Sequence, residues 1–140
     1  MRYLLLQLCL CFGLTVFGQS RNETAISNIL GTQASAWNRG DIEGFMKGYW
    51  ENDSLMFIGK SGITYGWQQT LDNYKKNYPD TAAMGKLAFD IIYLKKLSGD
   101  YAYVVGKWML NRSIGNLSGH FDILLRKIKG RWLIVADHSS

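Results

Sequence analysis

Cysteine is scarce in this chain of 140 residues, and both copies, Cys9 and Cys11, lie near the N-terminus. The remainder of the chain has no thiol, which excludes a disulfide framework and a cysteine-based metal site there. Histidine is equally rare, with two copies. The sequence also lacks the residue spacings typical of a metal ligand set, a phosphate-binding loop or a nucleophile triad. We therefore expect neither a metal ion nor a cofactor.

Long apolar runs are absent except at the N-terminus. The segment MRYLLLQLCLCFGLTVFGQS begins with a cation, continues with an apolar run from Leu4 to Phe17, and ends in small or polar residues. This order is typical of a secretory signal peptide and predicts cleavage after Gln19. The alternative is an N-terminal membrane anchor, but the run is shorter than the ~20 residues that a spanning helix needs. We expect a signal peptide over 1–19, a domain over 20–140, and a secreted or periplasmic protein without membrane contact.

Concentrated charge is absent as well. The formal net charge is +5, and loss of Arg2 with the signal peptide lowers it by one to +4. The basic residues are scattered over YKKNY, LKK and LLRKIKGR. Binding of nucleic acid would need a concentrated basic face with exposed stacking aromatic residues, so no nucleic-acid partner is expected.

A single proline, Pro79, and no internal repeat indicate one compact domain. Apolar residues at helical spacing predict helices in the first part of the chain, and from Lys86 onward the apolar period changes to two. Helices followed by strands predict an α+β fold, an antiparallel sheet curled around three N-terminal helices. The predicted helices are 24–38, 42–49 and 67–78, and the predicted strands are 54–59, 60–66, 86–94, 101–110, 119–127 and 131–139.

Four motifs, AWNRGDIEGFMKGYW, TYGW, YAYVVGKWML and GRWLIVADHSS, occur in an order that resembles the nuclear transport factor two-like superfamily. The resemblance is strongest to its SnoaL-like and ketosteroid-isomerase-like branch. It implies a cystatin-like cone in which a curved sheet wraps the helices, leaves an apolar pocket open at one end, and often dimerises through its outer face. This fold hosts isomerases, cyclases, dehydratases, ligand-binding proteins and assembly domains, so it assigns no activity by itself.

The catalytic groups of ketosteroid isomerase are a carboxylate base and an oxyanion hole made of a Tyr and a protonated Asp. By resemblance, the base would lie near Phe57 and Ile58, the Tyr at Gln33 and the Asp at Gly119. None of these residues has the required side chain. Ketosteroid isomerase chemistry is therefore not expected.

The segment RKIKGRW predicts a hairpin with the three-residue loop Ile128-Lys129-Gly130, so that Phe121 pairs with Asp137. Alternation along the two strands then directs Asp137 inward, where burial would raise its pKa. This makes Asp137 the one acidic candidate for general acid or base chemistry. The alternative is a structural carboxylate at the pocket rim.

The same register directs His120, Asp122 and His138 to the outer face of the sheet. The two histidines are expected to oppose each other there. Such a pair is able to bind a metal ion or sense pH. The alternative is that both imidazoles are solvated or lie in a subunit contact.

Aromatic residues are expected on both sides of the sheet. By resemblance, the face of YAYVVGKWML that carries Trp108 borders the pocket, and Gly106 leaves space there. On the opposite, outer face, an apolar patch is expected from Tyr101, Tyr103, Val105, Trp132 and Ile134. A patch of this kind favours a homodimer that covers it. The predicted ligand-binding residues are Trp37, Phe45, Tyr49, Phe57, Tyr65, Trp108 and Phe121. The alternative is that these aromatic residues fill the core and leave no pocket.

Three functions follow from these patterns. The first is a secreted or periplasmic domain that binds a small apolar or aromatic molecule. The second is an enzyme of the isomerase, dehydratase or cyclase type, in which Asp137 moves a proton and Tyr65, Gln33 or the Trp108 indole donates a hydrogen bond. The third is a dimeric assembly module without a ligand. An open pocket with polar groups near Asp137 would favour the first two, and a closed interior the third.

Overall fold

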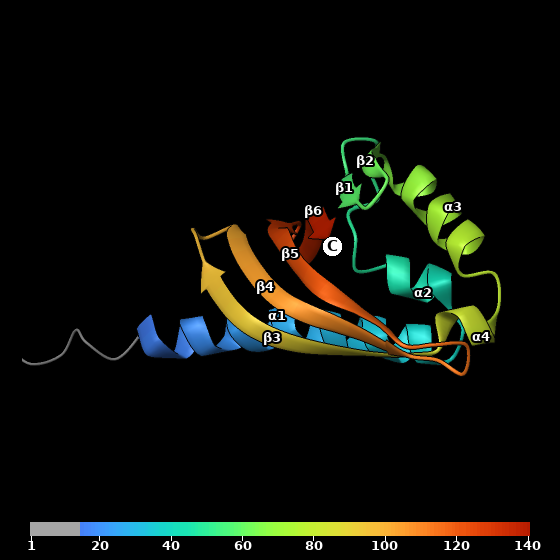
Figure 1. Ribbon diagram of the computed structural model, residues 1–140. Coiled ribbons are helices and arrows are strands. Elements are labelled where there is room, and N and C mark those ends of the chain that lie inside the picture. Colours follow the sequence, from blue (N-terminus) through green and yellow to red (C-terminus); the bar gives the residue numbers. More distant parts are fainter. Residues whose placement is uncertain (1–14) are drawn as a thin grey trace, which may run out of the picture.

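The computed structural model describes residues 15–140, which form four helices and one six-stranded sheet. Figure 1 shows three long, strongly curved strands with the first helix lying along them and the other helices gathered toward one end. The helices are α1 (Thr15–Asn38), α2 (Ile42–Met46), α3 (Trp67–Asn77) and α4 (Thr81–Met84). The strands are β1 (Met56–Gly59), β2 (Gly62–Tyr65), β3 (Lys86–Lys96), β4 (Tyr101–Asn111), β5 (Leu117–Ile128) and β6 (Arg131–Ser139).

The strand order in the sheet is β2-β1-β6-β5-β4-β3, and the sheet is open. All neighbouring strands are antiparallel except β1 and β6, which run parallel, so the expectation of an entirely antiparallel sheet is wrong for this one pair. The register shifts in β3 between Ile91 and Tyr93, and again where β5 pairs with β6. Such bulges bend a strand and increase its twist. They help the sheet to curve around α1.

The helices begin and end where the sequence supplies the required groups. Asp41 caps α2 because its side chain accepts a hydrogen bond from the Gly44 N–H at 2.7 Å. Asp80 caps α4 in the same way through the Ala83 N–H at 2.8 Å. This fourth helix is a correction to the predicted three, and its aspartate cap was the signal that could have revealed it.

The core lies between one side of α1 and the concave face of the sheet. Ile26, Leu30 and Trp37 follow each other at helical spacing on α1, and all three are buried. They pack within one cluster with Ala102, Val104, Ile123, Leu125 and Ile134 from the strands. Full burial of a Leu or Ile side chain contributes about 1.5–3 kcal/mol, so this contact accounts for much of the stability of the domain.

The hairpin between β5 and β6 differs from its predicted register. Ile128 pairs with Arg131 across a two-residue turn, in which Lys129 and Gly130 have φ angles of 49° and 78°. Two positive φ angles are typical of a type I′ turn, which matches the natural twist of a hairpin. The predicted three-residue loop is therefore wrong. Trp132 and Ile134, expected on the outer face, are buried in the core.

The predicted signal peptide lies mostly outside the described residues, which begin at Thr15. Helix α1 also begins at Thr15, nine residues before its predicted start, so the predicted cleavage site after Gln19 falls within this helix. Among the described residues, no helix combines the length and apolar character that crossing a membrane requires.

Candidate functional site

An open cavity of about 490 Å³ lies between the helices and the concave face of the sheet. Ligand pockets in proteins commonly occupy about 300–1,000 Å³, so the space suits a small organic molecule. Its walls include all the predicted ligand-binding residues except Tyr65. Tyr65 is 63% exposed and does not line the cavity, so its predicted position is wrong. The predicted residues in the wall are Trp37, Phe45, Tyr49, Phe57, Trp108 and Phe121.

The aromatic residues hold each other in fixed positions. The Phe45 and Tyr74 rings meet edge to face with centroids 5.2 Å apart, and Phe57 meets Tyr74 in the same way at 5.7 Å. Trp37 contacts Phe45 at 5.1 Å, and its indole N–H donates to the Met84 carbonyl at 2.9 Å. Aromatic contacts of this geometry each contribute about 0.5–1.5 kcal/mol beyond area burial. The cavity wall is therefore built from mutually supported rings.

Space for Phe121 comes from Gly106 on the neighbouring strand. The two residues pair in register, and a Cβ atom at Gly106 would lie 2.5 Å from the Phe121 Cζ atom. It would also lie 2.7 Å from the Asp90 carbonyl oxygen, which cannot move as freely as a side chain. Gly106 thus accommodates an aromatic ring of the wall, whereas the sequence predicted open space at this position.

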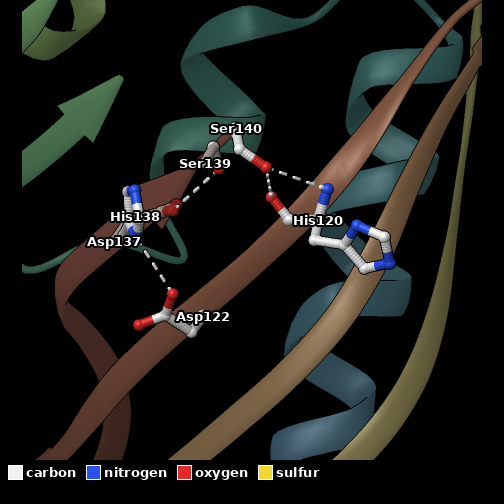
Figure 2. A network of polar contacts seen from close by, with 6 residues as sticks. All are labelled: His120, Asp122, Asp137, His138, Ser139 and Ser140. Atoms are coloured by element: carbon white, nitrogen blue, oxygen red, sulfur yellow. Dashed lines mark hydrogen bonds and ion pairs between the residues drawn. The ribbon is translucent and has the colours of Figure 1, made fainter. Parts of the chain in front are cut away.

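Asp137 is the acidic residue of the cavity wall, and it is 6% exposed. Its Oδ2 atom accepts a hydrogen bond from the Tyr49 hydroxyl at 2.6 Å, and its Oδ1 atom accepts one from the Ser139 hydroxyl at 3.0 Å. Figure 2 shows the Ser139 contact at the end of β6. Burial raises the pKa of Asp137 to about 6, and the hydrogen bonds from Tyr49 and Ser139 oppose that rise. The carboxyl is therefore mostly ionised at neutral pH and takes up a proton in mildly acidic solution.

A second hydroxyl extends this polar group. The Tyr49 and Tyr74 hydroxyl oxygens lie 3.4 Å apart. Burial raises the pKa of both tyrosines, and the nearby Asp137 charge adds to the effect. Both phenols therefore stay protonated near neutral pH. The site consists of one carboxyl and a chain of neutral hydroxyl groups, set in an aromatic wall.

The cavity rim is polar in part, although the exposed Leu117 also borders it. The turn between β1 and β2 contributes Lys60 and Ser61, both exposed, and α3 contributes Asn73 and Asn77. The Asn73 amide donates to the Thr64 hydroxyl at 3.2 Å, which ties α3 to β2 beside the opening. A ligand that entered beside these residues would pass polar side chains before it reached the aromatic interior.

The outer face of the sheet does not hold the predicted histidine pair. His138 pairs with Asp122, and their side chains form an ion-pair contact of 3.1 Å in an exposed position. Figure 2 shows the His120 ring pointing away from His138, while the His120 backbone bonds to Ser140. The expectation that the two histidines oppose each other is wrong because the hairpin register differs. The described residues contain no group of three or more metal-ligating side chains.

The three predicted hydrogen-bond donors have different environments. The Gln33 side-chain amide donates to the Phe45 carbonyl at 3.2 Å, and Tyr65 is exposed. The Trp108 indole nitrogen is buried and has no hydrogen-bond partner among the described residues. An unpaired buried N–H costs about 1–3 kcal/mol.

Sequence reasoning missed two residues of the polar site, Tyr74 and Ser139. Tyr74 lies within the predicted helix 67–78, three residues after Leu71 and four before Tyr78, but had no assigned role. Ser139 follows Asp137 by two residues on one strand, so alternation already placed both on the same face. That spacing was the available signal for their hydrogen bond.

Comparisons with known proteins found no matching family model and no matching curated protein. Among solved structures, an NTF-2 like protein of unknown function from Shewanella oneidensis MR-1 is 45% identical, with a TM-score of 0.82. The match covers 85% of this chain and 98% of that one. This chain belongs to the NTF-2 like family.

Other solved structures, at much lower identity, share the fold alone. A domain of unknown function with a cystatin-like fold from Nostoc punctiforme is 16% identical, with a TM-score of 0.72 over 86% of this chain and 77% of that one. A ketosteroid isomerase-like protein from Erwinia carotovora atroseptica is 19% identical, with a TM-score of 0.65 over 84% and 93% of the two chains. The Shewanella oneidensis protein confirms the resemblance of the sequence motifs to this superfamily, and the distant structures agree with the predicted fold class.

Proposed function

We propose that this NTF-2 like domain binds a small, largely apolar or aromatic molecule in its cavity. The observation that carries the proposal is the open aromatic-walled space of about 490 Å³ with one buried carboxyl, Asp137, in its wall. Apolar walls with a few fixed polar groups are the usual composition of a small-molecule site. The apolar walls would supply affinity, and Asp137 with its two hydroxyl partners would orient the ligand.

Binding would take place outside the cytoplasm, after removal of residues 1–19. The support for export is the composition of the N-terminal segment. A homodimer formed through the outer sheet face also belongs to this proposal. Because Trp132 and Ile134 are buried, its contact surface would consist of Tyr101, Tyr103 and Val105. An assembly module without a ligand is less well supported, because the cavity is open and Trp132 and Ile134 are buried.

The test uses the neutral fluorescent probe N-phenyl-1-naphthylamine. We expect its fluorescence to rise on binding. Leu117 lies at the cavity rim and is 40% exposed, so Leu117→Trp should narrow the opening and weaken binding of the probe. Ile114→Trp is the matched control, because Ile114 is 62% exposed and outside the cavity wall. Equal affinity in the wild type and both variants would show that the probe binds elsewhere.

A second function, proton transfer by Asp137, is favoured by the pKa of about 6 that burial gives this carboxyl. A general base works best when its pKa lies near the working pH. The carboxylate would take a proton from a carbon beside a carbonyl group and return it to the same or another carbon. Exchange of the methyl-ketone protons of 1-acetonaphthone in deuterated water, followed by NMR, tests this step. Wild-type protein should accelerate the exchange and Asp137→Asn should not; equal rates for both would contradict an enzymatic role.

A further inference from the structure

Charge in the cavity is unbalanced. Asp137 is the only buried ionisable carboxyl among the described residues, and none of their ion pairs involves it. Its hydrogen bonds come from two neutral hydroxyl groups. A buried charge without a partner of opposite sign is costly, and a cation that reached it would remove part of that cost.

The carboxylate also keeps acceptor capacity for a ligand. Each of its oxygens has two lone pairs and accepts one hydrogen bond, Oδ2 from Tyr49 and Oδ1 from Ser139. The ionised carboxylate has no hydrogen to donate. It therefore favours a ligand that brings N–H or O–H donors.

Aromatic rings surround the same space. Phe45 lies 5.8 Å from Tyr49 and 5.2 Å from Tyr74, and Phe57 lies 5.7 Å from Tyr74, measured between ring centroids. The faces of such rings attract ammonium groups, most strongly where water is excluded. A carboxylate and several rings in one cavity wall are complementary to an organic cation with an apolar body.

We propose that the ligand of this cavity is a protonated amine on an aromatic or aliphatic framework, with its ammonium N–H groups donated to Asp137. This rests on the proposed binding function and narrows its ligand class. Lys60 at the mouth carries the same sign as such a ligand, but it is exposed and its field is screened by water and salt. Asp137 is buried, so its attraction is screened much less.

Binding of a cation would depend on the ionisation of Asp137. Because burial raises the pKa of this carboxyl to about 6, affinity should increase as pH rises through that value. The other ionisable groups around it are Tyr49 and Tyr74 on the cavity side, and Asp122 and His138 on the outer side. His138 contacts Asp122 on the outer side, so the variant His138→Asn is the control.

The experiment compares 1-naphthylmethylamine with its neutral isostere 1-naphthylmethanol by isothermal titration calorimetry. At pH 7.5 the amine should bind about tenfold or more tightly than the alcohol, the difference expected for a hydrogen-bonded charge. The preference should shrink at pH 5, disappear in Asp137→Asn and persist in His138→Asn. The wild-type pH dependence keeps the test decisive even if Asp137→Asn does not fold.

Two results would overturn this proposal in different ways. Binding of the alcohol as tightly as the amine at both pH values would reject the cationic ligand and leave cavity binding intact. An amine preference that survives in Asp137→Asn would place the cation elsewhere. Failure of both compounds to bind at millimolar concentration would also count against the proposed binding function.

Discussion

The buried carboxyl of Asp137 should make the protein less stable as pH rises, and Asp137→Asn should remove that dependence. The folded pKa of about 6 lies above the ordinary value of 3.8, because burial disfavours the charge. A carboxyl with a raised folded pKa contributes stability that is fully present below pH ~4 and is lost as pH rises through ~6. The difference between these pKa values corresponds to about 3 kcal/mol.

The variant should therefore gain on the wild type as pH rises. An asparagine has nearly the same shape, and its oxygen still accepts a hydrogen bond from Tyr49 or Ser139. The loss of the other hydrogen bond costs about 1 kcal/mol, so the variant should be more stable than the wild type by about 1–2 kcal/mol at pH 8. Near pH 4 it should be equally stable or less stable.

Urea denaturation at pH 4.5, 6 and 8 measures this effect as the difference in unfolding free energy between wild type and variant. The matched control is Asp122→Asn, whose carboxylate is 39% exposed on the outer face. The difference in unfolding free energy between Asp122→Asn and the wild type should not change with pH in the way expected for Asp137→Asn. A difference between wild type and Asp137→Asn that stays constant over these pH values would refute the burial of a charged group in the cavity wall.

Three other predictions address the cavity wall, export and assembly. Gly106→Ala should destabilise the domain by about 1–3 kcal/mol in thermal melting, because the new methyl group would meet Phe121. Gly31→Ala, where a methyl group would have nothing within 4 Å, should not destabilise it. Equal melting temperatures for Gly106→Ala and the wild type would refute this packing. Intact-mass analysis of exported protein should give a chain that starts at Ser20, and a mass that includes either cysteine would argue against the signal peptide. Light scattering should show a wild-type dimer and a Tyr103→Arg monomer; a wild-type monomer at high concentration would reject the outer-face contact.

Three of the four helices were predictable because they depend on local patterns. Ile26, Leu30 and Trp37 repeat at helical spacing, and Pro79 marks the end of α3 in the sequence. The long strands were predictable from alternation for the same reason. In both cases, one residue's environment follows from its neighbours a few positions away.

The inward direction of Asp137 was predicted correctly from a wrong register. The turn is one residue shorter than predicted, which reverses the faces of Trp132 and Ile134. A register shift near Val135 then reverses the alternation again before Asp137. Bulges of this kind follow from the bending of the whole sheet around α1, so no local pattern reports them.

The resemblance predicted a pocket and six of its seven named wall residues, but the residue pattern left open whether the interior is filled or empty. Whether Trp37, Phe45 and Phe121 fill the interior or only surround it depends on side-chain volumes and on the separation of helices and sheet. Tyr65 shows the limit at the level of one residue: its edge strand leaves it exposed, although its neighbour Thr64 lines the cavity. The hydroxyl chain through Tyr74 likewise depends on how α3 packs against α2.

The most direct test of the account is a crystal structure determined with an excess of 1-naphthylmethanol. This neutral compound tests cavity binding without assuming a cationic ligand. We predict that its ring system lies in the space bordered by Phe45 and Phe57, with its hydroxyl group within hydrogen-bond distance of Asp137. A cavity filled by collapsed side chains, or a ligand found only on the outer face of the sheet, would contradict the account.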